Sequence, residues 1–581
     1  MKLSRYLLLA VSSVFFFNSC AKKEKETTNL DPAFEKLSEE FLKGYFEFRP
    51  ATATYLGMHE YDRQKRDYSK PALEAELARL KDFEQKLVSI GDSISTKASY
   101  DYKILLSAIR QEIFSFEDLQ VFNKNPMTYA GTLSLNIFIQ RDFAPLNERV
   151  QSIIAIEEQA PAIFAAAREN LNDSLAKPYV ETAMMIAEGT ADFLEKDLTE
   201  ALKEVTDENL KKEFEVSNKK AINELKEFSN WLKKEKLSIT HNNYAIGKDN
   251  YQKMLLFNEM LTISPEEILA MGLEELKKEQ ALFAEVAKVI DPNKKPIEVF
   301  EALKKDHPTP ENLIPDAKKN LEAIRQFLVD KKIITIPSEV RVEIKETPQF
   351  ARSTSTASMD TPGPFEKATQ AFYYITPTEK SWTAKQKEEW LSQFNYYVTD
   401  VISIHEAYPG HYVQFLHLNA SSATKIEKIF GSYAFIEGWA HYTEKMMIEE
   451  GFGGNDELAK AKYHMAQLDE SLLRLCRLCV SLKTHTEGMN LADATKFFQD
   501  NAYYEYKPAY QEALRGTFDP GYLSYTLGKL QILKLREEYK AQEGDKFSLQ
   551  KFHDMLLDNG MPPVQLIREV MLKDPAKTAA F

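Results

Sequence analysis

The stretch IHEAYPGHY at residues 404–412 joins a His-Glu pair, typical of a zinc-binding helix, to a histidine six residues after the first. Zinc hydrolases commonly place two histidines four residues apart on one helix face, with a glutamate base after the first. On a straight helix, six residues span about 600°, which leaves His411 about 120° away from His405 and about 9 Å further along the axis. A straight helix therefore cannot direct both imidazoles to one ion.

Pro409 and Gly410, between the two histidines, change this geometry. Pro409 removes a backbone donor and its ring clashes with the carbonyl of His405, so the helix must kink or bulge there. Gly410 permits backbone dihedrals that other residues avoid. The pair predicts a kink or bulge that could return His411 to an ion on His405. The alternative is a helix end followed by a turn, with His411 unconnected to any metal.

A second helical stretch, GSYAFIEGWAHYTEKMMIEE at 431–450, supplies candidates for a third ligand. Glu437, His441 and Glu444 lie at i, i+4 and i+7, so all three project from one helix face. Bulky apolar residues occupy the opposite face. Carboxylates and a histidine in such surroundings need a buried partner, which a cation would supply. An exposed stripe of ordinary i,i+4 pairs is the alternative.

The rest of the chain is mainly helical in pattern. With 20 glycines and 24 prolines in 581 residues, the composition favours long helices over a turn-rich β architecture. The clearest strand signals are KKIITIPSEVRVEIKETP at 331–348 and QAFYYITP at 370–377. We expect a mainly α fold: a large, multi-helix, two-lobed body with a small sheet over 331–377 beside the His-Glu helix. A polar seam at 240–252 divides an N-terminal helical region, 31–240, from a catalytic region, 241–581.

The first twenty residues, MKLSRYLLLAVSSVFFFNSC, have the features of a lipoprotein signal peptide. Lys2 and Arg5 precede an apolar run, and the FNSC stretch that ends at Cys20 resembles a bacterial lipobox. We expect residues 1–20 to be a signal peptide, Cys20 to carry a lipid, and 21–30 to form a polar tether. An ordinary cleaved signal peptide is the alternative. Either way the protein is exported, and a lipid would anchor it in the bacterial cell envelope.

Several other classes of function find no support. The net charge of −14 argues against nucleic acid as a partner. The chain has no G-x-S-x-G elbow of a serine hydrolase and no G-x-x-x-x-G-K-[ST] nucleotide loop. Cys476 and Cys479 lie in an apolar helical run without a second cysteine pair, so we interpret them as core residues.

The combination of motifs resembles a bacterial family catalogued as a domain of unknown function, number 885. The likeness rests on HEAYPGH at 405–411 and on EGWA at 437–440, and it extends along most of the mature chain. Further matching segments are NYAIGKDNYQKML, TPGPFEKATQAFYYIT, RLCRLCVSLKTHTEGMN and PGYLSYTLGKLQILKLR. Where the family usually has Asp-x-Gly-Leu-His, this chain reads SLKTH at 481–485, which keeps only the histidine.

The family looks like a distant relative of helical zinc peptidases of the gluzincin type. This resemblance implies that His405, His411 and Glu437 bind one Zn²⁺ and that Glu406 is the general base. Such a site leaves a fourth position for a water, whose pKa on zinc falls to about 7. Glu406 would take the proton of that water as it attacks a carbonyl, and would pass the proton to the leaving amine.

The developing oxyanion needs a further hydrogen-bond donor. Tyr525 is our preferred candidate over Tyr522, which lies three residues earlier, and His485 is the other plausible donor. Arg536 lies eleven residues after Tyr525, about three turns along the same helix. It could pair with a substrate carboxylate or form an internal salt bridge.

His441 and Glu444 are expected to lie behind the ligands and orient them. If Glu437 is not the third metal ligand, Glu444 is the next candidate for that role.

These inferences predict a zinc-dependent hydrolase that cleaves peptide or amide bonds in a peptide or peptide-like substrate. An edge strand beside the zinc would favour peptides. A zinc-dependent esterase or non-peptide amidase is one alternative. A non-catalytic binding protein that retains the fold is another, and the intact Glu406 argues against it.

Overall fold

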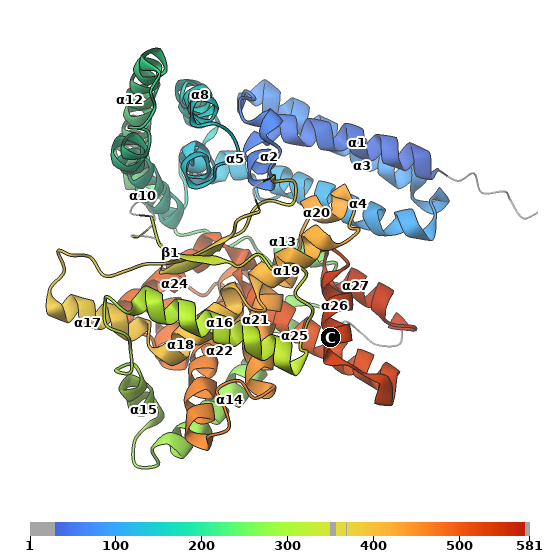
Figure 1. Cartoon of the computed structure of the whole chain (residues 1–581). Coiled ribbons are helices and arrows are strands. Elements are labelled where there is room, and N and C mark those ends of the chain that lie inside the picture. Colours follow the sequence, from blue (N-terminus) through green and yellow to red (C-terminus); the bar gives the residue numbers. More distant parts are fainter. Residues whose placement is uncertain (1–29, 349–351, 353–355, 368, 576–581) are drawn as a thin grey trace, which may run out of the picture.

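The computed structural model describes residues 30–348, 352, 356–367 and 369–575 (Figure 1). The predicted signal peptide, the lipidated Cys20 and the tether up to residue 29 lie outside the described residues. No helix within the described residues is both long and apolar enough to cross a membrane. The chain is mainly α-helical with one small sheet, as the sequence predicts.

Residues 31–239 form an upper lobe of two helix groups, each with its own apolar core (Figure 1). The first group consists of α1 (Asp31–Phe48), α2 (Pro50–Leu56), η1 (His59–Tyr61), α3 (Lys70–Ile90), η2 (Gly91–Ser93) and α4 (Thr96–Glu117). The second consists of α5 (Val121–Lys124), α6 (Met127–Ala130), η3 (Gly131–Leu133), α7 (Ile137–Gln140), α8 (Leu146–Glu157), α9 (Ala160–Asn170), α10 (Lys177–Phe193), the π-helical η4 (Leu194–Leu198), α11 (Thr199–Ala201), α12 (Glu208–Trp231), the π-helical η5 (Leu232–Lys236) and η6 (Leu237–Ile239).

The long helix α12 illustrates why this lobe is helical. Its N-cap residue Asp207 accepts hydrogen bonds from the backbone amides of Asn209 and Leu210. Its buried residues recur at three- and four-residue spacing, so one stripe of the helix enters the core while lysines and glutamates face solvent.

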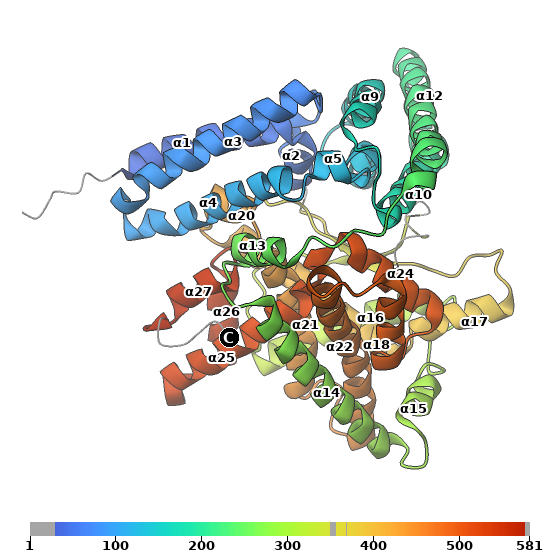
Figure 2. The ribbon, with the colours of Figure 1, turned by 180° about the vertical axis from the view of Figure 1, so that it is seen from behind.

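The remaining helices form a larger lower lobe (Figure 2). They are α13 (Lys248–Glu259), α14 (Pro265–Ile290), α15 (Pro296–Leu303), α16 (Leu313–Lys331), α17 (Ala384–Gln393), α18 (Tyr396–Glu406), α19 (His411–Ala420), α20 (Lys425–Ile429), α21 (Tyr433–Glu449), α22 (Glu457–Thr486), α23 (Leu491–Asn501), α24 (Tyr506–Phe518), η8 (Pro520–Leu523), α25 (Ser524–Glu543), η9 (Gly544–Lys546), α26 (Leu549–Leu557) and α27 (Val564–Met571). The central α22 packs against α14 on one side and against α18, α21 and α25 elsewhere.

The small sheet has three strands in the order β1-β3-β2, where β1 is Glu343–Glu346, β2 is Ala357–Asp360 and β3 is Phe372–Ile375. β3 pairs in parallel with β1 and antiparallel with β2. β3 matches the predicted strand at 370–377. Only four residues of the predicted 331–348 stretch form a strand, because Ile333 and Ile334 instead enter the apolar core beside α16. β2 was not predicted.

The sheet lies beside α18, as expected, and at the boundary between the lobes (Figure 1). The Ser403 hydroxyl of α18 donates a hydrogen bond to the Tyr373 hydroxyl of β3 at 3.3 Å. On the other side, the buried Arg141 of the upper lobe pairs with Asp360 at the end of β2. The sheet therefore ties the upper lobe to the helix that carries His405.

Helices α21 and α25 cross in direct backbone contact. A Cβ at Gly438 would lie 2.4 Å from the Cα of Gly528, and a Cβ at Gly528 would lie 1.7 Å from the carbonyl oxygen of Ala434. Only glycines allow this approach, which fixes α21 firmly against α25.

Candidate metal centre

The predicted kink between His405 and His411 is a complete break in the helix. α18 ends at Glu406 and α19 begins at His411, and the connecting turn contains a cis peptide bond between Tyr408 and Pro409. The amide of Gly410 donates a hydrogen bond to the carbonyl of Ile404 at 3.0 Å, so the turn folds back over the last turn of α18.

Two residues make this tight turn possible. A Cβ at Gly410 would lie 1.7 Å from the carbonyl oxygen of His405, so a larger residue cannot occupy this position without moving the backbone. The buried indole of Trp439 on α21 donates to the carbonyl of Pro409 at 2.9 Å and approaches that of Gly410 at 3.3 Å. The EGWA segment therefore holds the turn from the facing helix.

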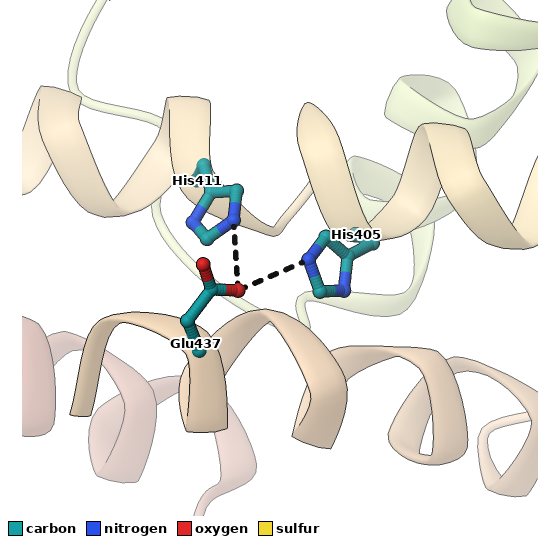
Figure 3. A group of neighbouring side chains, drawn as sticks. All are labelled: His405, His411 and Glu437. Carbon is teal, nitrogen blue, oxygen red and sulfur yellow. Dashed lines mark ion pairs between the residues drawn. The ribbon is translucent and has the colours of Figure 1, made fainter. Parts of the chain in front are cut away.

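The break directs both imidazoles toward Glu437 on α21 (Figure 3). Oε2 of Glu437 lies 3.5 Å from Nε2 of His405 and 3.6 Å from Nε2 of His411. Among the described residues, these three form the one group of His, Cys, Asp or Glu side chains that could hold a metal ion, with ligand atoms within 4.8 Å of one another. A helix end followed by a turn was the alternative to a kinked metal-binding helix, and the structure has both the helix end and the turn. His411 nevertheless converges with His405, as the metal hypothesis requires.

The spacing of these atoms fits a small cation. For bonds of about 2.1 Å to zinc, the edge of a coordination tetrahedron is about 3.4 Å, close to both nitrogen–oxygen separations. Oε2 of Glu437 is buried and has no hydrogen-bond partner among the described residues, which is costly unless a positive group meets it. Two histidines and one carboxylate are also a known donor set for catalytic zinc.

A second carboxylate, Glu444, lies behind His405. Its Oε1 is 2.7 Å from Nδ1 of His405, and its Oε2 is 3.0 Å from Nδ1 of His441. Arg474 of α22 approaches the same carboxylate at 3.6 Å. Glu444 and His441 are completely buried. Glu444 therefore fixes the ring of His405 with Nε2 toward Glu437, and it is not one of the three converging side chains.

The pKa values reflect this concentration of carboxylates. Burial alone would lower the pKa of His405, but the nearby carboxylates of Glu437 and Glu444 raise it to about 10. Burial alone would raise the pKa of Glu437, but His405 and His411 hold it well below its usual range. The cluster therefore favours a positive charge at its centre.

Glu406, the expected general base, is the last residue of α18 and is half-buried. Burial raises the pKa of Tyr373 on β3, and the charge of Glu406 adds to that rise. Glu406 therefore lies close enough to β3 to act electrostatically on Tyr373.

Tyr525, the preferred oxyanion donor, lies against His405, with their rings stacked at 6.5 Å between centroids. Its hydroxyl accepts a hydrogen bond from the Tyr433 hydroxyl at 3.4 Å, and Arg515 donates to Tyr433 at 3.0 Å. Tyr433 and Arg515 were not among the site residues predicted from the sequence. Tyr433 lies four residues before Glu437 and shares its helix face, which was the available signal.

His485 and Tyr522, the other two candidate donors, are held in the protein interior. Nε2 of His485 lies 2.8 Å from the carbonyl of Gly516, and its Nδ1 accepts from the amide of Ile246 at 3.3 Å. Burial lowers the pKa of His485 to about 4. The structure leaves His485 no free nitrogen for an oxyanion, because backbone groups occupy both. Tyr522 is completely buried.

Arg536 forms the internal salt bridge that was its alternative role. Its guanidinium contacts the carboxylate of Glu449 at 3.1 Å and donates to the Tyr442 hydroxyl at 3.3 Å. These contacts satisfy the guanidinium within the protein, so the structure gives no support to a role in binding a substrate carboxylate.

Comparison with known sequences identifies one family. The model for "Bacterial protein of unknown function (DUF885)" matches residues 50–571. Among functionally curated proteins, no sequence matches the chain.

Two solved structures share the fold. One, described as "a putative lipoprotein of unknown function from Shewanella oneidensis", is 24% identical, with a TM-score of 0.79 over 93% of this chain and 100% of that chain. The other, described as "the putative lipoprotein from Colwellia psychrerythraea", is 19% identical, with a TM-score of 0.74 over 92% of this chain and 97% of that chain. At these identities the likeness concerns the fold alone.

Proposed function

The chain belongs to the DUF885 family, and we propose that it is a zinc-dependent hydrolase, most simply a metallopeptidase that cleaves peptide or amide bonds. One observation carries the proposal. Two imidazole nitrogens lie 3.5 and 3.6 Å from a buried, unpartnered carboxylate oxygen, and a glutamate directly follows the first histidine. In this proposal His405, His411 and Glu437 hold the ion and leave a position open for water.

Zinc bound there would supply Lewis acidity, which activates water near neutral pH and polarises a carbonyl group. The side chains of the protein supply the remaining chemistry. Glu406 accepts the proton of the attacking water and delivers it to the leaving nitrogen. Glu444 and His441 keep the His405 ring in one orientation throughout.

Tyr525 is proposed to donate a hydrogen bond to the oxyanion that develops on the substrate. A guanidinium can only donate, so the Tyr433 oxygen accepts from Arg515 and its single proton goes to the oxygen of Tyr525. The proton of Tyr525 is then free to point elsewhere. Arg515 and Tyr433 thus orient Tyr525 as a donor toward the side where its ring meets His405.

The proposed location is the bacterial cell envelope, with a lipid on Cys20. The FNSC stretch supports this location, and so do the two structural neighbours described as putative lipoproteins. The substrate would accordingly be a peptide or peptide-like molecule outside the cytoplasm.

Metal analysis beside a peptide-library digest tests the proposal. The purified full chain should contain one zinc per molecule, and His411→Ala should lose it. Glu406→Gln should retain zinc but lose hydrolysis by about 10²–10⁴-fold. Zinc that persists in His411→Ala would remove the ligand assignment, and undiminished hydrolysis by Glu406→Gln would remove the mechanism. A matched ester and amide, assayed in parallel, separate an esterase from a peptidase.

The proposed donor chain has its own test. Tyr525→Phe should lower kcat by about 10²-fold or more, and Tyr433→Phe by about tenfold, with little change in KM. Tyr522→Phe is the matched control, because its buried hydroxyl has no hydrogen-bond partner among the described residues. Equal effects of all three substitutions would contradict the assignment.

A further inference from the structure

A cavity of about 600 Å³ lies between the two lobes, on elements other than those that carry the three converging side chains. Its walls come from α10 of the upper lobe, the connection at 242–245, the C-terminal end of α22 with the loop at 488–490, and α23 and α24. Figure 2 shows α10 directly above α24, and the two helices are in contact. No residue of the candidate metal centre lines this cavity.

The lining carries no net charge. Lys177 and Glu181 are the charged residues of the lining, and they lie 3.7 Å apart, one turn apart on α10. In a chain with 28% charged residues, this lining is unusually neutral. Because Lys177 and Glu181 offset each other, an ion, a nucleotide or a charged peptide terminus would find no net opposite charge here, and the cavity suits a neutral ligand.

The cavity wall carries side-chain amides that are accessible to a ligand. Asn242, Asn243 and Gln499 line the cavity, the first two are exposed and the third is half-buried. Each amide offers donors and an acceptor together. Thr484 also lines the cavity but is only 3% exposed, and its Oγ1 is buried, so it contributes to the shape of the wall.

An aromatic surface completes the cavity. Tyr506 is 65% exposed, and its ring stacks on that of Tyr510 at 6.1 Å between centroids and 24° between ring planes. Both rings line the cavity. A stacked, exposed aromatic pair presents a flat apolar face to a ligand.

We propose that this interlobe cavity binds a neutral saccharide. A sugar ring combines an apolar face, which can lie on Tyr506, with hydroxyls that each donate and accept, as the three amides require. A peptide that binds by adding a strand needs a sheet edge, and the cavity is lined by helices and their connections without a strand. The inference does not depend on the proposed hydrolase.

Calorimetric titration of the full chain tests this proposal. The probes are β-1,4-linked trimers of N-acetylglucosamine and of glucose, an α-1,4-linked glucose trimer, and, as the competing class, a trialanine blocked at both ends. We expect at least one saccharide to bind with a dissociation constant of about 1 mM or tighter. Absence of binding by all three saccharides, or binding of the blocked peptide in their place, overturns the proposal.

Variants locate the binding. Tyr506→Ala should weaken saccharide binding by about tenfold or more, and Gln499→Ala by a smaller factor. Tyr55→Ala is the matched control, because Tyr55 is also an exposed tyrosine, at 50%, but lies on α2 outside the cavity. Saccharide binding that is undiminished in Tyr506→Ala, or equally diminished in Tyr55→Ala, would place the ligand elsewhere and overturn the assignment.

Discussion

Glu157 on α8 of the upper lobe and Glu444 on α21 of the lower lobe are both completely buried glutamates, but they differ in their surroundings. Glu157 accepts one hydrogen bond, from the Ser217 hydroxyl at 2.5 Å, and its other oxygen has no partner among the described residues. Glu444 lies among His405, His441 and Arg474.

The two carboxyls respond to burial in opposite ways. Burial raises the pKa of Glu157 to about 8, since Ser217 only partly offsets the desolvation. Burial acts in the same direction on Glu444, but Arg474 and the two histidines hold its pKa well below its usual range. In the upper lobe, Glu157 is therefore an uncharged carboxylic acid within an apolar core. The lower lobe retains a buried negative charge, and that charge orients a histidine of the candidate metal centre.

The largest contrast should come from Glu444→Gln. This change removes one carboxylate charge from a completely buried cluster and leaves Arg474 with Glu470, and His405 with Glu437, as the remaining partner. We therefore expect the free energy of unfolding to fall by about 3–5 kcal/mol. Zinc affinity should fall by about 10–100-fold, because the His405 ring loses its support. Urea denaturation and competitive zinc titration measure the two effects. Glu157→Gln is the matched control. An equal loss of unfolding free energy in both variants would contradict the distinction between a charged Glu444 and a neutral Glu157.

Gly410→Ala should cause the next largest loss of stability. A Cβ at this position meets the carbonyl of His405 at 1.7 Å, so the turn must open at a cost of about 3 kcal/mol or more. The opening displaces His411, so zinc should be lost as well. Thermal unfolding and metal content report on both consequences. A variant with parental stability and a full complement of zinc would show that the turn does not set the site.

Glu157→Gln should change how stability depends on pH. Between about pH 4.5 and 8 the unfolded chain has lost the Glu157 proton while the folded chain keeps it, so the parent loses stability as the pH rises. The glutamine variant lacks this loss. Relative to the parent, it should gain about 3–4 kcal/mol between pH 5 and pH 8. Urea denaturation at the two pH values measures this gain, and a constant difference would mean that Glu157 is charged in the folded protein.

The smallest effect is expected for Gly189→Ala in the upper lobe. Gly189 lies inside α10, is exposed, and has space for a Cβ with nothing within 4 Å. Alanine has the higher helix propensity, so the free energy of unfolding should rise by about 0.5–1 kcal/mol. Thermal unfolding detects this change. A loss of stability would show that the added methyl group is not accommodated at this position in α10.

The sequence was most informative where the chemistry is local. Pro409 and Gly410 predict a break in the helix because their effects act within one turn of backbone. The convergence of Glu437 with the histidines follows from its place on the polar face of α21. The break is more complete than a kink, because the sequence alone did not show that Trp439 holds the turn from outside.

Contacts between distant segments could not be predicted. Arg515 and Tyr433 are 82 residues apart in the sequence, and no local sequence pattern predicts their contact. His485 was a candidate donor because SLKTH keeps the histidine of the family's segment, while its actual partners are backbone groups of Ile246 and Gly516. β2 has the sequence ASMD, with weak strand propensity, and forms only because β3 lies beside it.

The glycine contact between α21 and α25 bears on how this architecture can diversify. Glu437 precedes Gly438, and Tyr525 lies three residues before Gly528, so a backbone-to-backbone crossing sets the distance between them. No side chain intervenes that a point mutation could lengthen or shorten. New substrate preferences would therefore have to arise in the surrounding loops and cavity walls. The spacing between Glu437 and Tyr525 should stay the same among relatives that keep both glycines.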